Sequence, residues 1–290
     1  MPSPPPRAEL LVDPAWLAGE HSAPDLRIYD CNTILAPDPV TTYRVESGRP
    51  VWEAGRIPGA GFIDNQQDLS ITPHKYRFML LPPADYARNV GRLGIGDGLR
   101  VVFYSSGHTM WATRVWATLF AYGFEAMVLD GGLARWPAEG HPVSTEPVTH
   151  PPATFTPRPR AGFMLGRDDV AAAIGRADTV LVNALAREQF HGTAGTSFGR
   201  QGRIPGSVSA PYPEIVDPGT NRFIDWAAIA RLYAGAGIAP DRRVLNYCGG
   251  GISATLNVFA QHSMGYEDIA LYDASMQEWA QDESLPMERG

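Results

Sequence analysis

The sequence predicts an α/β protein of two similar domains, each with a mostly parallel sheet and helices on both faces. Three observations support this fold class. Short apolar runs typical of buried strands alternate with helical stretches along most of the chain. The order of motifs in the first half returns in the second. Between the halves, the composition shifts to proline among Thr, Ser and His, which suits a semi-rigid extended linker. We therefore assign residues 8–143 to the first domain, 144–165 to the linker and 166–290 to the second domain.

In the first half we expect a short entry helix over residues 8–17 and a strand over 26–30. Cys31 follows that strand, and we take it as structural. The segment 32–49 carries no strong signal. Further along, we expect helices over 83–93 and 112–122, strands over 99–104 and 126–129, and a short helix containing Trp136.

The second half repeats this order. We expect helices over 167–174, 226–234 and 254–264, and strands over 179–183 and 244–247. The clearest duplicated motifs are Gly-Arg-Ile-Pro-Gly at 55–59 and 202–206, and an Asp followed six residues later by Trp (Asp130 with Trp136, Asp273 with Trp279).

The totals bound the class of protein. A chain of 290 residues with 44% hydrophobic residues can bury a substantial core in one large or two medium domains. The net charge of −7 and the absence of a basic stripe argue against nucleic acid as a partner. No apolar run is long enough to span a membrane, and the first seven residues contain no signal-peptide core, so we expect a cytoplasmic protein without a membrane partner.

The two cysteines form neither a disulfide framework nor a thiolate metal site, and they suit a reducing compartment. The seven histidines are scattered without ligand spacing. We therefore expect no metal and no cofactor.

The segment around Cys248 carries the strongest functional signal. Three glycines, Gly249, Gly250 and Gly251, follow the cysteine and let the backbone fold tightly, turning its N–H groups toward one point. The start of the helix at 254 adds unpaired N–H groups and a partial positive charge. A thiol held there loses its proton more readily, and the thiolate is the nucleophile. Most free cysteines are simply small buried hydrophobes, but a cysteine between a strand end and a glycine-rich turn that opens a helix favours catalysis.

The first half differs at the corresponding place. It has Ser105, Ser106, Gly107 and His108 after Tyr104, in a loop that is one residue longer. Without a thiol, we expect the first copy to be inactive and to support the second copy's site across an interface. The alternative is a serine nucleophile at Ser105 or Ser106 with His108 as its base, although residues so close together on one loop are more often turn formers.

In these duplicated motifs, in Gly94-Ile95 and in the loop from Cys248 to Ser253, the sequence resembles a tandem-domain sulfurtransferase of the rhodanese superfamily over nearly its whole length. The resemblance implies an inactive N-terminal copy and an active C-terminal copy. It also implies that the Cys248 thiolate takes the outer sulfur of a donor such as thiosulfate, and that the resulting persulfide passes it to cyanide or a thiol. The partners would be this small donor and a thiophilic acceptor, and we expect a monomer or weak dimer.

The implied anion site consists of the loop amides after Cys248, which act much as an oxyanion hole does. Ser253 can add its hydroxyl to this cradle or serve as the helix N-cap. The residues concerned are Gly249, Gly250, Gly251, Ile252 and Ser253.

The sequence departs from the family at several positions. Thiosulfate-specific members carry basic residues just after the cysteine, where this chain has glycines. Mercaptopyruvate-specific members carry a serine at the position of Gly250 and a histidine where Phe78 stands, and both types have an arginine where this chain has Leu185. An anionic donor still needs a cation, for which Arg200 and Arg203 are the candidates; their alternative role is surface solubility.

Two rival functions follow from the loop. A phosphatase or arsenate reductase needs an arginine six residues after the cysteine, where this chain has Ala254, so we reject that class. A non-catalytic module that binds a partner or carries a persulfide stays open, because the loop is neutral and the arginine is missing. We expect a thiosulfate-type sulfurtransferase, with mercaptopyruvate as the second choice of donor.

Overall fold

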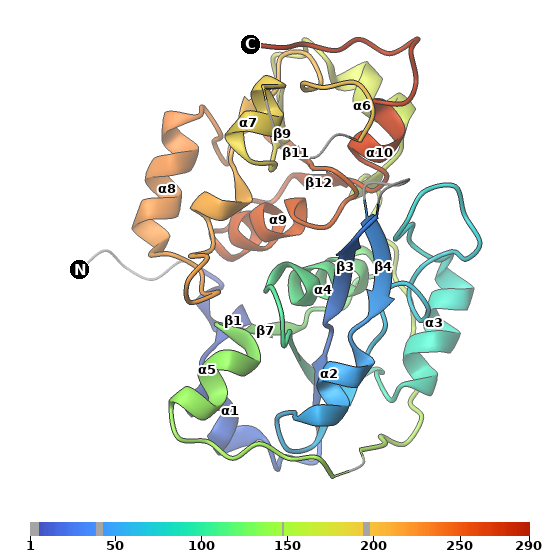
Figure 1. Ribbon diagram of the computed structural model, residues 1–290, viewed down its shortest axis with the longest axis vertical. Coiled ribbons are helices and arrows are strands. Elements are labelled where there is room, and N and C mark those ends of the chain that lie inside the picture. Colours follow the sequence, from blue (N-terminus) through green and yellow to red (C-terminus); the bar gives the residue numbers. More distant parts are fainter. Residues whose placement is uncertain (1–5, 39–42, 147, 194–197) are drawn as a thin grey trace.

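The computed structural model describes residues 6–38, 43–146, 148–193 and 198–290, which form two α/β domains that meet along one face (Figure 1). Each domain has a five-stranded sheet in which all neighbouring strands run parallel. The strand orders are β1-β7-β6-β2-β5 and β10-β9-β11-β12-β8. Read in the opposite direction, the second order matches the first strand for strand: β8, β12, β11, β9 and β10 correspond to β1, β7, β6, β2 and β5. The two halves of the sequence therefore share one topology.

In both sheets the central strand is a buried apolar run. The first sheet comprises β1 (Leu11–Val12), β2 (Leu26–Asp30), β5 (Ala60–Phe62), β6 (Arg100–Tyr104) and β7 (Met127–Leu129). The second comprises β8 (Met164–Leu165), β9 (Thr179–Asn183), β10 (Val208–Ser209), β11 (Arg243–Tyr247) and β12 (Ile269–Tyr272).

Helices surround the two sheets, which confirms the predicted α/β class. In the first domain they are α1 (Pro14–Glu20), α2 (Arg49–Ala54), α3 (Pro83–Arg92), α4 (Met110–Ala121) and α5 (Gly132–Ala138). In the second they are α6 (Arg167–Ala173), α7 (Arg187–His191), α8 (Trp226–Gly235), α9 (Ala254–Ser263) and α10 (Met276–Trp279). None of the helices that the structure describes has the length and apolar character needed to cross a membrane.

The domains meet where α4 packs against α9. Both helices are buried on all sides, as expected for helices that lie between two sheets. The hydroxyls of Thr113 and Thr255, which occupy equivalent positions in the repeat, are 2.8 Å apart. Near them, the rings of Trp116 and Phe259 meet edge to face at 5.0 Å. The interface is thus apolar and nearly symmetric, and the start of each helix carries a loop that contacts the opposite domain.

Three sequence expectations need correction. The α-helix expected over 8–17 begins only at Pro14, because the Asp13 carboxylate caps it by accepting the Trp16 N–H at 2.8 Å. Before it, Ala8–Leu10 form a single 3-10 turn and Leu11–Val12 form β1. The segment 32–49 contains an antiparallel hairpin of β3 (Thr33–Pro37) and β4 (Tyr43–Ser47). The predicted linker, 144–165, is a packed segment: Phe155 and Phe163 are buried in the core, and Met164–Leu165 form β8 of the second sheet.

Candidate active site

Cys248 lies in the turn between β11 and α9, at the carboxyl edge of the second sheet, where parallel sheets place their sites. Its N–H donates to the Ser275 hydroxyl at 3.1 Å, and its carbonyl accepts the Met276 N–H at 3.0 Å. The Gly249 carbonyl accepts the Gln277 N–H at 2.7 Å. The start of α10 therefore fastens the first two residues of the loop. Cys248 is only 1% exposed, so its thiol is almost entirely covered by neighbouring atoms.

The amides of this loop are available to an anion. Within the described ranges, no N–H of residues 249–253 donates to a protein acceptor. The Ser253 hydroxyl makes no capping hydrogen bond, although Ser253 occupies the N-cap position of α9. Free amides on a tight turn at a helix start form a concave site for negative charge. This geometry suits a thiolate or persulfide on Cys248.

In the first domain three amides of the corresponding loop, 105–109, donate to protein acceptors. The Ser106 N–H donates to the Asp30 carboxylate at 3.2 Å, and the Gly107 N–H donates to the Ser105 hydroxyl at 3.0 Å. The Thr109 N–H donates at 2.9 Å to the side-chain oxygen of Asn221, which comes from the second domain. Equivalent loops of the two domains thus differ in their amides: those after Cys248 are available to an anion, whereas most of those after Ser105 already donate to protein acceptors.

The alternative of a serine nucleophile finds no support in this geometry. The Ser106 hydroxyl donates to Asp30, and the Met110 N–H donates to His108 Nδ1 at 3.1 Å. Among the described residues, no hydrogen bond joins His108 to either serine. Burial lowers the pKa of His108, so its base strength is reduced as well.

Two glycines of the Cys248 loop are required by close approach of other atoms. Gly251 has φ +73°, and a Cβ there would lie 2.3 Å from the Asp273 carbonyl oxygen. A Cβ on Gly249 would lie 2.0 Å from the ring of Phe198, so this ring covers the backbone beside Cys248. Gly249 therefore lacks room for the basic side chain of thiosulfate-specific relatives unless Phe198 moves.

The first domain holds the loop from the other side. Arg114, on α4, donates from Nη1 to the Gly251 carbonyl at 3.0 Å and from Nη2 to the Phe78 carbonyl. Its Nη2 also lies 2.8 Å from Asp273 Oδ1, as an ion pair buried from solvent. Asp273 Oδ2 in turn accepts the Leu80 N–H at 2.9 Å. These contacts agree with the prediction that the first copy supports the site across the interface.

Sequence reasoning missed two residues beside the loop, Arg77 and Tyr43. The main chain of Arg77 is bonded to the Gln277 side chain, and its guanidinium lies over the Tyr43 ring, 4.6 Å from the centroid. No local pattern identifies them, because they come from the other domain and from the hairpin that the sequence did not reveal.

The two predicted cations have other partners. Arg200 donates to the carbonyls of Trp279, Ala280, Asp282 and Leu285. Arg203 pairs with Glu288, donates to the Gly290 carbonyl at 2.6 Å and lies over the Phe190 ring. Both guanidinium groups therefore hold the carboxyl-terminal segment in place, which explains why basic residues occur here without serving the loop.

Two further features concern the second cysteine, Cys31, and the possible metal ligands. Cys31 is fully buried, and burial raises the pKa of its thiol well above the usual range, which suits a structural residue. Within the described part of the chain, no three His, Cys, Asp or Glu side chains gather in a way that could hold a metal ion.

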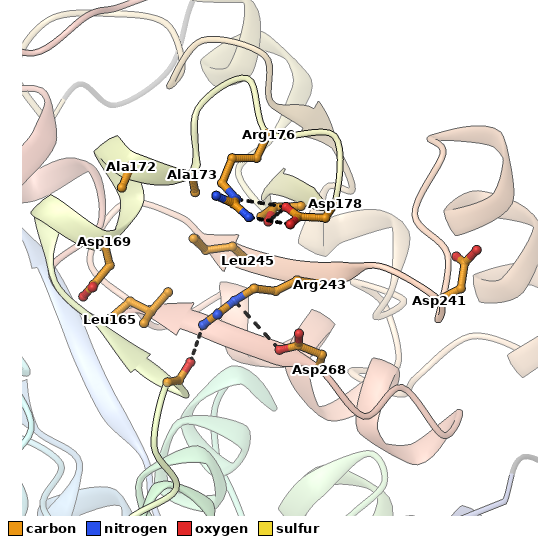
Figure 2. Close-up of a pocket in the computed structure, with 12 residues that line it drawn as sticks. Leu165, Asp169, Ala172, Ala173, Arg176, Asp178, Asp241, Arg243, Leu245 and Asp268 are labelled. Atoms are coloured by element: carbon orange, nitrogen blue, oxygen red, sulfur yellow. Dashed lines mark hydrogen bonds and ion pairs between the residues drawn. The ribbon is translucent and has the colours of Figure 1, made fainter.

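A separate pocket of about 560 Å³ lies at the opposite, amino edge of the second sheet (Figure 2). Its charged side chains largely pair with one another: Arg176 with Asp178, and Arg243 with the Gly162 carbonyl and Asp268. Since it lies at the other end of β11 from Cys248, we assign it no part in the chemistry of the loop.

Comparison with known proteins identifies the family of both domains. A family model described as the rhodanese-like domain matches residues 13–139 and again 167–282. The chain belongs to the rhodanese-like family. Its two rhodanese-like domains place it among the tandem sulfurtransferases of that family.

The relatives of this rhodanese-like protein are named after two different sulfur donors, 3-mercaptopyruvate and thiosulfate. It is 30% identical to a probable 3-mercaptopyruvate sulfurtransferase of Pseudomonas aeruginosa, over 97% of this chain and 98% of the relative. It is 29% identical to a putative thiosulfate sulfurtransferase of Mycobacterium tuberculosis, over 98% of both. The crystal structure of the Escherichia coli 3-mercaptopyruvate sulfotransferase matches with a TM-score of 0.80 at 23% identity, covering 92% of this chain and 98% of that one. At that identity, the structural match shows the fold alone.

Proposed function

We propose that this rhodanese-like enzyme transfers a sulfane sulfur from thiosulfate to a thiophilic acceptor through a persulfide on Cys248. The observation that supports this most is the set of free amides over residues 249–253, beside a cysteine and at the start of α9. Such a cradle stabilises negative charge on sulfur before and after transfer.

The reaction has two half-steps. The Cys248 thiolate attacks the outer sulfur of thiosulfate, the bond between the two donor sulfurs breaks, and sulfite leaves with the electron pair. The terminal sulfur of the persulfide is then attacked by cyanide or a thiolate, the sulfur–sulfur bond breaks, and the Cys248 thiolate is restored. Neither step changes the overall electron count, and neither needs a cofactor.

Mercaptopyruvate is the second candidate donor. The Pseudomonas aeruginosa relative is named for it, and the neutral loop of this chain matches neither donor type in full. The site of a cytoplasmic enzyme of this kind stays reduced, which keeps the thiol free.

The test is direct. After incubation with thiosulfate alone, intact mass should increase by one sulfur atom, and addition of cyanide should release thiocyanate and restore the original mass. Cys248→Ser should abolish both the adduct and turnover while keeping the fold, because a hydroxyl cannot form the persulfide. Equal turnover in the variant would remove Cys248 from the mechanism. An unmodified wild-type mass with both donors would favour a non-catalytic binding module.

A matched change in the first domain tests why that copy is expected to be inactive. Ser105→Cys, made together with Cys248→Ser, places a thiol at the equivalent position. There the Ser106 and Thr109 N–H groups keep their acceptors on Asp30 and Asn221, while the Gly107 N–H, which donates to the Ser105 hydroxyl, loses its acceptor. We expect no sulfur adduct by intact mass. An adduct as complete as that of Cys248 would show that the free amides are not what distinguishes the two copies.

A further inference from the structure

Neither of the two arginines predicted on the second domain is available to the anionic donor proposed above. The loop from Cys248 to Ser253 contains no charged side chain, and Leu185 is an apolar, buried residue. Arg200 and Arg203 are engaged by the carboxyl-terminal segment. Loop amides alone can hold the reacting sulfur, but the far end of a donor carries a second negative group that needs its own partner.

The first domain places one arginine at the edge of the loop. The Arg77 N–H donates to Gln277 Oε1 at 3.1 Å, and the Arg77 carbonyl accepts from Gln277 Nε2 at 3.0 Å. The Gln277 N–H donates to the Gly249 carbonyl at 2.7 Å. The Gln277 side chain also lies beside Gly250, where an added Cβ would be 3.4 Å from Nε2. Gln277 thus connects the Arg77 backbone to the loop, and these hydrogen bonds do not involve the Arg77 side chain.

The guanidinium of Arg77 is oriented by the hairpin. It lies 4.6 Å from the centroid of Tyr43, the first residue of β4, and the end of the hairpin that carries Tyr43 points toward α10 (Figure 1). Burial raises the pKa of the Tyr43 phenol, Cys248 acts in the same direction, and Arg77 opposes it. Tyr43 therefore lies within electrostatic range of both Cys248 and Arg77, and it contacts the Arg77 guanidinium directly.

We propose that Arg77, supported by Tyr43, binds the anionic group of the sulfur donor whose outer sulfur reacts with Cys248. This role rests on the sulfur-transfer function proposed above. A planar guanidinium suits a carboxylate or a thiosulfate-type oxyanion, because either can accept two parallel hydrogen bonds. The donor class is then small anions with a transferable sulfur at one end, and the binding site requires both domains.

The test separates anion binding from sulfur transfer. Cys248 is alkylated with iodoacetate, which carries a carboxylate, and with iodoacetamide, which has nearly the same shape and no charge, and peptide mass distinguishes Cys248 from Cys31. We expect Arg77→Ala to lower the ratio of the iodoacetate rate to the iodoacetamide rate about tenfold, which corresponds to the loss of one charge-assisted hydrogen bond. Arg77→Lys should restore part of this ratio. The KM for thiosulfate should rise by a similar factor.

Arg88→Ala is the matched control, because it removes the same charge from an exposed position on α3. Among the described residues, Arg88 pairs only with Asp85, at 2.7 Å. Arg88→Ala should leave the alkylation ratio unchanged. Thermal stability of Arg77→Ala should fall only slightly, because the contacts to Gln277 are made by the main chain and the side chain loses its contact with the Tyr43 ring. An unchanged ratio in Arg77→Ala would overturn the assignment. A lowered ratio in a protein that forms no persulfide would keep the anion site and reject the sulfur-transfer function.

Discussion

Replacing Arg114 with leucine is expected to destabilise the protein by about 3–5 kcal/mol and to remove most turnover. Arg114 is 2% exposed, and its ion pair with Asp273 crosses the domain interface. Without the guanidinium, the buried carboxylate loses its counter-ion. The Gly251 and Phe78 carbonyls lose their donor at the same time. The loss therefore affects both the fold and the position of the Cys248 loop.

The measurement is chemical denaturation together with thiocyanate release. Adding Asp273→Asn to Arg114→Leu should recover part of the stability, because the amide removes the unpaired charge and still accepts the Leu80 N–H. Recovery of stability without recovery of turnover would show that the contact with Gly251 matters in itself. A loss below about 1 kcal/mol in the single variant would contradict a buried, essential ion pair.

The repeat provides a matched control. Asp130 is the counterpart of Asp273, and it pairs with Arg222 at 2.9 Å and with Arg135 at 3.0 Å. Arg222 is half exposed, and Arg135 remains when it is removed. Arg222→Leu should therefore cost about 1 kcal/mol or less. The difference in the loss of unfolding free energy between Arg114→Leu and Arg222→Leu then measures how much the Arg114–Asp273 pair gains from being buried and from Arg114 being the only arginine paired with Asp273 among the described residues.

The sequence was sufficient for the elements that carry their own pattern. The apolar runs at 100–104 and 243–247 predict the central strands, and the glycines after Cys248 predict the cradle. The hairpin β3–β4 was missed although β4 alternates apolar and polar residues, which is the pattern of a strand with one exposed face. Its strands have only five residues each and form a separate two-stranded sheet, so they lack the continuous apolar run that identified the central strands. Tyr43 was missed with it.

The two arginines predicted to bind the donor have structural partners, and the sequence could not show this for a related physical reason. Arg200 and Arg203 are close in sequence to the second Gly-Arg-Ile-Pro-Gly motif, so proximity along the chain favoured them. Their partners are main-chain carbonyls of the carboxyl-terminal segment, which no spacing rule reveals. Arg77 is 171 positions before Cys248, and only the packing of one domain on the other brings it to the loop.

The loop itself yields the last prediction, Gly251→Ala. Gly251 has φ +73°, a conformation that costs an alanine about 1–2 kcal/mol, and its new Cβ would lie 2.3 Å from the Asp273 carbonyl oxygen. That oxygen belongs to main chain beside the Arg114 ion pair, so it cannot turn aside as a flexible side chain could. We expect a loss of stability of about 2 kcal/mol or more and a large fall in turnover.

Gly250→Ala is the control for this change, because its Cβ would meet only the Gln277 side chain at 3.4–3.6 Å, an ordinary contact. Its stability by chemical denaturation should stay within about 0.5 kcal/mol of wild type. If the two variants were equally stable, the left-handed turn at Gly251 would not be needed to direct the amides toward Cys248. A persulfide that forms as fast in Gly251→Ala as in wild type would lead to the same conclusion, because the cradle would then survive a turn of different shape.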